Sequence, residues 1–300
     1  MAEKIFTENS HFHLKPRNEN KSHHLMESFM NHKEKRIFLI RALLDERNDY
    51  RNIVIPFEED TQNMLLRSLF NVRMPGPVSE DFLKVQDGFL KEEISAKGIT
   101  ELPSLTPVQP NIYLWQGDIT TLSCDAIVNA ANAGMTGCYQ PCHNCIDNCI
   151  HTYAGVQLRN YCAELMQKQG HEEPTGQAKI TPAFNLPCRY VLHTVGPIVQ
   201  GPLTAEHEEM LASCYRSCLE LAQRNGIQSL AFCCISTGVF GFPQNRAAEI
   251  AVQTVREFLN QAQQDCTACS ESASERTNRI KVIFNVFKDE DYAIYAKLLG

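Results

Sequence analysis

The densest chemistry in this sequence lies in residues 137–151, which read GCYQPCHNCIDNCIH. Four cysteines and two histidines fall within fourteen of these residues. Cys138, His143 and Cys145 offer two thiolates and one imidazole, which are ligands that suit zinc. Three protein ligands leave a fourth position for water or substrate, which is the arrangement of a catalytic zinc site.

Two alternatives compete with this interpretation. In the first, Cys142 or Cys149 completes the shell and the metal is structural. In the second there is no metal: the cysteines repeat at intervals of four, three and four residues, the spacing of one helix face, and are buried as small apolar side chains. Pro141 disfavours an uninterrupted helix here because its ring clashes with the preceding turn. The helix face is therefore broken at its start, and we favour zinc.

Four other segments carry polar or glycine-rich chemistry where predicted strands end. Asp118, in GDIT, can accept hydrogen bonds from an exocyclic amine, and Asn132, in VNAANAG, can donate to and accept from ribose hydroxyls. In ISTGVFGFP, residues 235–243, glycines and successive N–H groups lead into a helix, which favours a diphosphate. Taken singly, each could be an ordinary cap or turn. His193, in HTVGP, is interpreted as a buried, hydrogen-bonded core residue.

The elements that must position this chemistry alternate between strand-like and helical patterns. The β-rich runs are residues 112–115, 126–129, 190–195, 229–236 and 280–287, and the helical stretches are 147–168, 206–225, 244–263 and 289–299. This alternation predicts an α/β layered domain with helices on both faces of a sheet. Most of the strands are apolar at consecutive positions, as expected when both faces are covered. Ligands of such sheets bind at the carboxyl ends of the strands.

The sequence divides into four parts. Residues 1–35 are polar, hold five histidines and lack apolar periodicity, which predicts a flexible extension. In residues 36–98 apolar residues recur at intervals of three and four residues, which predicts a small helical domain. Ser79 is placed to cap its third helix. Residues 99–110 contain three prolines and predict a linker. Residues 111–300 are the α/β domain.

Composition excludes several classes of protein. Hydrophobic residues make up 43% of the 300 residues and charged residues 21%, so the chain can bury a large core and is not predominantly disordered. A net charge of -7 argues against nucleic acid as a partner. No apolar run is long enough to span a bilayer, and the N-terminus lacks the pattern of a signal peptide. We therefore expect a soluble, cytoplasmic monomer without a membrane partner.

All thirteen cysteines lie between Cys124 and Cys269. An odd number without a secretory signal argues against a disulfide framework. Cys266 and Cys269 form a CxxC pair in a polar stretch. Without a second pair nearby, they are interpreted as two exposed thiols of a surface insertion, with a redox-sensitive pair as the alternative.

Taken together, these segments resemble the macrodomain family, and in particular its zinc-containing branch of microbial ADP-ribosyl hydrolases. The motifs GDIT, VNAANAGMTGC, GCYQPCHNCIDNCIHTYAG, HTVGP and ISTGVFGFP occur in the family's order and spacing. The resemblance covers about residues 111–300, and the preceding helical segment is similar to the N-terminal extension of that branch. It implies a three-layer α/β/α fold around a mixed sheet, with ADP-ribose as the ligand.

The resemblance also implies roles for the residues that contact ADP-ribose. Asp118 would bind the adenine amine, with the Ile119 backbone beside it. Asn132 would bind the distal ribose, next to the scissile bond. The diphosphate would be wrapped by Ser236, Thr237, Gly238, Val239 and Phe240, with the Phe240 ring near the distal ribose.

For the metal, the resemblance implies Cys138, His143 and Cys145 as the zinc ligands. Cys142 and Cys149 are additional to the family's pattern. Asp147 is the nearest acidic side chain, so it could orient His143 or accept a proton; a plain charge at the helix N-terminus is the alternative. His151 is interpreted as structural.

The implied activity is a zinc-dependent hydrolase that removes mono-ADP-ribose from modified proteins, with ester links on acidic side chains as the expected substrate. Zinc could polarise the distal ribose and lower the pKa of a bound water. One alternative is a binding module in which zinc only braces a loop. Another is a deacetylase of O-acetyl-ADP-ribose that uses the same residues.

Overall fold

The computed structural model describes residues 30–268 and 280–300, except for the side chains of residues 262–268. Most of the expected N-terminal extension lies outside these ranges, as do Cys269 and the Cys266 side chain, so the interpretation of the CxxC pair stays a prediction. None of the helices in the two described ranges is both long and apolar enough to cross a membrane.

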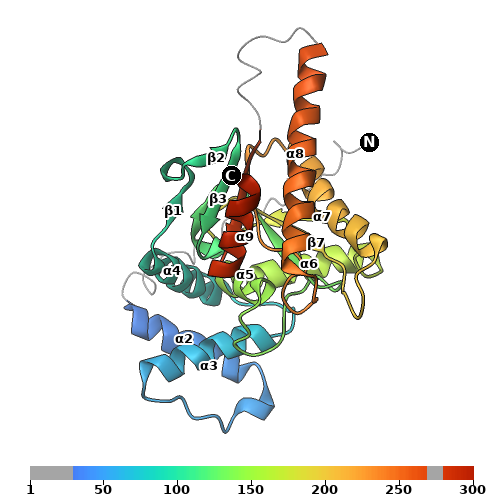
Figure 1. The fold of residues 1–300 in the computed structure, drawn as a ribbon. Coiled ribbons are helices and arrows are strands. Elements are labelled where there is room, and N and C mark those ends of the chain that lie inside the picture. The colour runs from blue at the N-terminus through green and yellow to red at the C-terminus, as the bar shows by residue number, and fades with distance from the viewer. Residues whose placement is uncertain (1–29, 269–279) are drawn as a thin grey trace, which may run out of the picture.

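A seven-stranded mixed sheet forms the centre of the α/β domain (Figure 1). In spatial order its strands are β2 (Pro107–Gln109), β3 (Ile112–Gln116), β9 (Lys281–Val286), β8 (Ser229–Phe232), β5 (Ala126–Ala131), β7 (Tyr190–Val195) and β6 (Ala178–Pro182). The five inner strands run parallel, and the edge strands β2 and β6 are antiparallel to their neighbours. The segments that follow β3, β8 and β5 therefore lie along one edge of the sheet.

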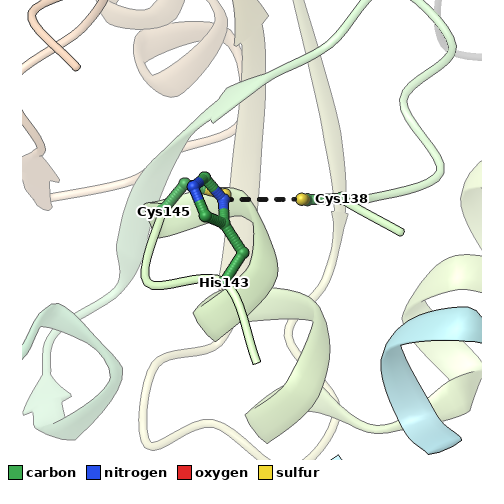
Figure 2. A group of neighbouring side chains, drawn as sticks. All are labelled: Cys138, His143 and Cys145. Carbon is green, nitrogen blue, oxygen red and sulfur yellow. Dashed lines mark hydrogen bonds between the residues drawn. The ribbon is translucent and has the colours of Figure 1, made fainter. Parts of the chain in front are cut away.

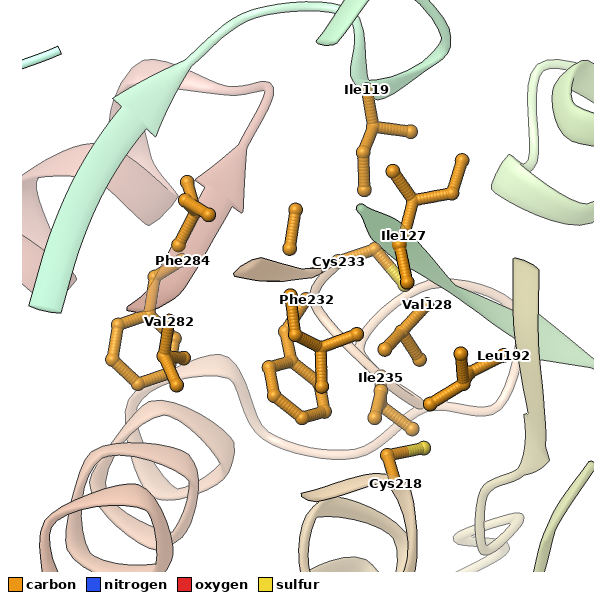
Figure 3. Packing of buried hydrophobic residues seen from close by; sticks show 14 of the residues in the cluster. Ile119, Ile127, Val128, Leu192, Cys218, Phe232, Cys233, Ile235, Val282 and Phe284 are labelled. Carbon is orange, nitrogen blue, oxygen red and sulfur yellow. The ribbon is translucent and has the colours of Figure 1, made fainter. Parts of the chain in front are cut away.

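Helices cover both faces of this sheet. Ile127 and Val128 are consecutive in β5, so their side chains point to opposite faces, and both are fully buried. Figure 3 shows them packed among the side chains of the neighbouring strands, including Phe232 and Leu192. The covering helices are α5 (Ile146–Ala154), α6 (Val156–Gln169), α7 (Ala205–Arg224), α8 (Gln244–Ala268) and α9 (Asp289–Leu299). The predicted α/β/α fold with a mixed sheet is confirmed.

Within the described residues, three helices precede the sheet and form a second, smaller core. They are α2 (His32–Asp45), α3 (Glu59–Val72) and α4 (Glu80–Lys97), with a 3-10 turn η1 (Asn48–Tyr50) between the first two. Ser79 caps α4, as predicted, by accepting a hydrogen bond from the Phe82 amide. Leu39, Leu66 and Phe89 belong to the small core, whereas Ile94 of α4 belongs to the core of the sheet. The helical region is therefore packed against the sheet domain (Figure 1).

The structure differs from the sequence prediction in several places. Helix α2 begins at His32, inside the segment 1–35 that was expected as a flexible extension. Residues 99–110, expected as a linker, contain β1 (Thr100–Glu101), the 3-10 turn η2 (Leu102–Ser104) and β2, and β1 pairs with β4 (Leu122–Ser123). Pro107 is compatible with β2 because an edge strand can leave the missing N–H on its outer side. The helix expected over 147–168 is divided at Gly155, whose φ of 93° starts a new helix. Strand β6 was not predicted, because AKITP is short and carries no clear alternation.

Candidate active site

The cysteine- and histidine-rich segment is a loop that runs into the start of α5. Helix α5 begins at Ile146, and Cys145 is its N-cap, with its Sγ 3.4 Å from the Asn148 amide nitrogen. Cys138 and Cys142 therefore precede the helix, which excludes the single buried helix face considered above. Gly137 has a φ of 85°, and a Cβ there would come within 2.7 Å of the His151 ring. This position therefore requires glycine, because a side chain would be both strained and obstructed.

Three side chains of this loop converge on one point. Figure 2 shows Cys138, His143 and Cys145 facing one another, with Cys138 Sγ 3.6 Å from His143 Nδ1. The three ligand atoms lie within 4.8 Å of one another. A tetrahedral zinc ion with ordinary bond lengths separates a sulfur and a nitrogen ligand by about 3.6 Å. The donor set and its spacing therefore fit zinc.

The Cys145 thiol is held in its neutral form by the protein alone. Burial raises the pKa of Cys145 to about 12, against the hydrogen bond from Asn148, and the nearby Cys138 thiol adds to the rise. A divalent cation has the opposite effect, because it favours the thiolate that coordinates it.

The two additional cysteines turn away from this group and toward α3. Cys142 Sγ lies 3.2 Å from the Ser68 hydroxyl and 3.4 Å from the Met64 carbonyl oxygen. Cys149 Sγ lies 3.6 Å from Nη2 of Arg67. In this arrangement neither thiol points at the ligand group of Cys138, His143 and Cys145.

Asn132 and Asp147 form a hydrogen-bonded pair beside the loop. The Asn132 amide donates to the Gly137 carbonyl at 3.0 Å and to Asp147 Oδ2 at 3.2 Å. Because both amide hydrogens are used, Oδ1 of Asn132 is the atom left to accept a hydrogen bond from a ligand. Asp147 Oδ1 accepts from Asn129 at 2.8 Å. Burial raises the pKa of Asp147 to about 6, against the opposing hydrogen bonds from Asn129 and Asn132.

A buried polar chain extends this pair into the core. His193 is fully buried and contacts Asn129 at 3.1 Å and the Thr181 hydroxyl at 3.0 Å, so it is the hydrogen-bonded core residue that the sequence predicted. His151 is buried as well. Its ring lies close to Cys162 and His193, which makes a second group of possible ligands inside the core.

Asp118 follows β3 at the start of the 3-10 turn η3 (Ile119–Thr121). Its Oδ1 accepts from the Thr120 amide and hydroxyl, and its Oδ2 lies 2.8 Å from Lys97 Nζ at the end of α4. Burial alone would raise the pKa of Asp118, but the hydrogen bonds from Lys97 and Thr120 outweigh it and lower that pKa. Each carboxylate oxygen has two lone pairs, so Oδ2 can still accept a second donor.

The loop after β8 carries the predicted diphosphate-binding residues Ser236, Thr237, Gly238, Val239 and Phe240. Gly238 and Val239 are exposed, and a Cβ added at Gly238 would meet no atom within 4 Å. Ser236 has a φ of 64°, and a Cβ at Gly196 would come within 2.0 Å of its Oγ. The segment containing Gly196 and the loop after β8 are thus in close contact, and the exposed main chain faces an open space.

Sequence reasoning missed two residues that shape this site. Asn148 donates to the carbonyl oxygens of Cys138 and Gln140 at 3.3 and 3.0 Å, which ties the loop to the helix that follows it. Arg67 of α3 donates to the His143 carbonyl at 2.8 Å. A polar residue in a first helical turn was the available signal for Asn148, whereas nothing in the sequence near Arg67 points to the loop.

Comparisons with known proteins show what this chain is similar to. The model of the Macro domain family matches residues 128–251. A protein from Treponema medium named protein-ADP-ribose hydrolase is 58% identical over 275 residues, 90% of this chain and 100% of that protein. One of the same name from Staphylococcus aureus (strain MSSA476) is 46% identical, over 90% of this chain and 97% of its own. A Trypanosoma brucei macrodomain solved in complex with ADP-ribose aligns with a TM-score of 0.56 and 31% identity, over 78% of this chain and 95% of that one.

Proposed function

The chain belongs to the macrodomain family, among its protein-ADP-ribose hydrolases, and on that premise we propose that it removes mono-ADP-ribose from modified proteins with a zinc ion bound by Cys138, His143 and Cys145. The observation that carries the zinc part of the proposal is the convergence of these three side chains, with Cys138 Sγ and His143 Nδ1 at the separation that tetrahedral zinc requires. Three protein ligands leave the metal a fourth position for substrate or water.

The binding of ADP-ribose is assigned to the loops along one edge of the sheet. Asp118, with the Ile119 backbone beside it, accepts a hydrogen bond from the adenine amine. The loop from Ser236 to Phe240 binds the diphosphate through its backbone amides, because the chain carries a net charge of -7 and no basic side chain occurs in this loop. Asn132 then accepts a hydrogen bond from a hydroxyl of the distal ribose at its Oδ1.

The chain's own residues hold the distal ribose in place for hydrolysis. Asp147 is 5% exposed and both of its oxygens are engaged, so we assign it the role of fixing the Asn132 amide rather than of taking a proton from substrate. Asn132 orients the ribose hydroxyl toward the metal group. When bound, zinc supplies a Lewis acid that polarises the ribose or lowers the pKa of a water molecule.

The test compares two cysteine variants of the same loop. Cys138→Ala removes a proposed ligand, so we expect loss of bound zinc by elemental analysis and loss of ADP-ribose release from a modified protein. Cys142→Ala removes a thiol that faces α3, and we expect zinc to be retained. Undiminished turnover by a metal-free Cys138→Ala protein would contradict the zinc part of the proposal. Zinc loss in both variants would place Cys142 in the ligand set.

The same measurements decide between turnover and mere binding. Calorimetry with ADP-ribose should show binding retained in Cys138→Ala while turnover is lost. Binding by the unmodified chain without any turnover would instead identify an ADP-ribose-binding module with structural zinc. We also propose ester links on acidic side chains as the substrate, which rests on the family resemblance. The test compares three substrates: a protein modified on glutamate, a protein modified on arginine, and O-acetyl-ADP-ribose. Preference for O-acetyl-ADP-ribose would indicate a deacetylase.

A further inference from the structure

Helix α3 of the small helical region lies directly against the loop that holds the proposed zinc ligands. Its residues contact the loop and the first turns of α5 through side chains rather than through apolar packing alone. The loop itself is irregular between Gly137 and Cys145, with Pro141 exposed and Cys142 at a φ of 51°. A left-handed conformation is unfavourable for a residue with a Cβ, so contacts from outside the loop must hold it.

Arg67 is the central contact. Its Nη2 donates to the His143 carbonyl at 2.8 Å and to Asn148 Oδ1 at 3.2 Å. Asn148 in turn donates to the carbonyls of Cys138 and Gln140. One guanidinium thus connects, directly or through Asn148, to the main chain of two of the three proposed zinc ligands. Its Nε is buried and has no hydrogen-bond partner among the described residues, so the side chain is oriented by the loop rather than by α3.

Neighbouring contacts fix the same loop from the same helix. Asn71 Oδ1 accepts from the amide of Cys142, the residue in the left-handed conformation, and Asn71 Nδ2 donates to Thr152 of α5 at 2.9 Å. The end of α3 is held in return by Arg159 of α6, whose Nη1 donates to the carbonyls of Phe70, Asn71 and Arg73. Because helix ends leave carbonyls without partners, these bonds attach α3 firmly to the sheet domain.

We propose that Arg67 is a positioning residue of the zinc site, through which the helical region sets the affinity of the loop for the metal. This inference rests on the proposed zinc site and adds to it a residue outside the macrodomain. Arg67 holds the His143 main chain, and thereby its imidazole, at the distance from Cys138 at which both can bind one ion. Groups that orient metal ligands change affinity by about 10- to 100-fold when they are removed, and we expect an effect of this size.

The test measures zinc affinity of the full chain by competition with a chromophoric chelator, and the absorption of the cobalt-substituted protein. Arg67→Ala should bind zinc 10- to 100-fold more weakly, show altered cobalt bands, and bind ADP-ribose as the unmodified chain does. Arg67→Lys keeps a cationic donor that is only one bond shorter and should show a smaller loss. This second variant keeps the test decisive if Arg67→Ala does not fold.

Arg73→Ala is the matched control, because the Arg73 side chain bonds to Glu46 and to main-chain carbonyls within the helical region. It should lower thermal stability without changing zinc affinity. The inference is overturned if both Arg67 variants bind zinc within twofold of the unmodified chain, or if Arg73→Ala weakens zinc as much as Arg67→Ala. Absence of zinc binding by the unmodified chain would overturn the proposed zinc site as well, which distinguishes the two failures.

Discussion

The pairing of Asn132 with Asp147 makes a sharp prediction for the substitution Asp147→Asn. The carboxylate accepts from two amides, Asn129 at 2.8 Å and Asn132 at 3.2 Å. An asparagine at 147 can accept from only one of them, and its own NH₂ group must face the other. The shorter, more buried bond to Asn129 should be kept. The new donor then faces the Asn132 amide, which can no longer hold its orientation.

The expected loss follows from the bond that is removed. A hydrogen bond to a charged group contributes about 1.5–3 kcal/mol, and each 1.36 kcal/mol changes a rate tenfold, so turnover should fall by about 10- to 150-fold. Because Asn132 is assigned to the reacting end of ADP-ribose, kcat should fall more than the affinity for ADP-ribose. The measurements are ADP-ribose release from a modified protein, calorimetry with free ADP-ribose, and zinc content.

Asp125→Asn provides the matched control. Asp125 precedes β5, at the opposite end of the strand from Asn132, and its Oδ2 accepts from the amides of Gln228 and Ser229 and from the Ser229 hydroxyl. This variant should lose stability while its kcat stays unchanged. A kcat for Asp147→Asn within threefold of the unmodified chain, with zinc retained, would refute the positioning role. Loss of zinc in Asp147→Asn would instead assign this residue to the support of the metal.

Two further predictions concern binding and stability. Gly238→Val should weaken ADP-ribose binding in calorimetry at an unchanged melting temperature, because a side chain there meets no protein atom but obstructs the exposed main chain; unchanged affinity would remove this loop from the binding site. Burial lowers the pKa of His193 to about 3, so between pH 6.5 and 3 the unfolded chain binds a proton that the folded chain does not. Lowering the pH from 7 to 5.5 should therefore reduce the free energy of unfolding by about 1.2 kcal/mol through this group. His193→Gln lacks the imidazole, so its free energy of unfolding should fall by about 1.2 kcal/mol less than that of the unmodified chain in urea titrations at the two pH values. His151 and Cys162 lie beside His193, and Asp147 shares the Asn129 amide with it. Equal pH dependence of the two proteins would contradict the assignment.

The α/β fold was predictable because its signals are local in the sequence. The inner strands are apolar at consecutive positions, which only a strand covered on both faces requires, and β5 is buried in this way. The short edge strands β2 and β6 gave no such signal, because they are partly exposed and are formed by pairing with β3 and β7. Their formation depends on neighbours distant in sequence, which residue patterns do not report.

The convergence of the three proposed ligands was predictable for a different reason. Cys138, His143 and Cys145 are close in sequence on both sides of Pro141, so a short loop can bring them near one another. The sequence could not separate these thiols from Cys142 and Cys149, which have the same chemistry and spacing. Helix α3 distinguishes the two sets of thiols, because its Ser68 contacts Cys142 and its Arg67 contacts Cys149.

These contacts explain why the helical region and the loop of the proposed zinc ligands belong to one proposed site. A helix presents its side chains at fixed positions through its own hydrogen bonds, whereas the loop before Cys145 has few internal bonds and includes a left-handed residue at Cys142. Such a loop can reach the geometry of a metal site only if another rigid element selects one of its conformations. Helix α3 does this through Arg67 and Asn71, and Arg159 attaches that helix to the sheet domain.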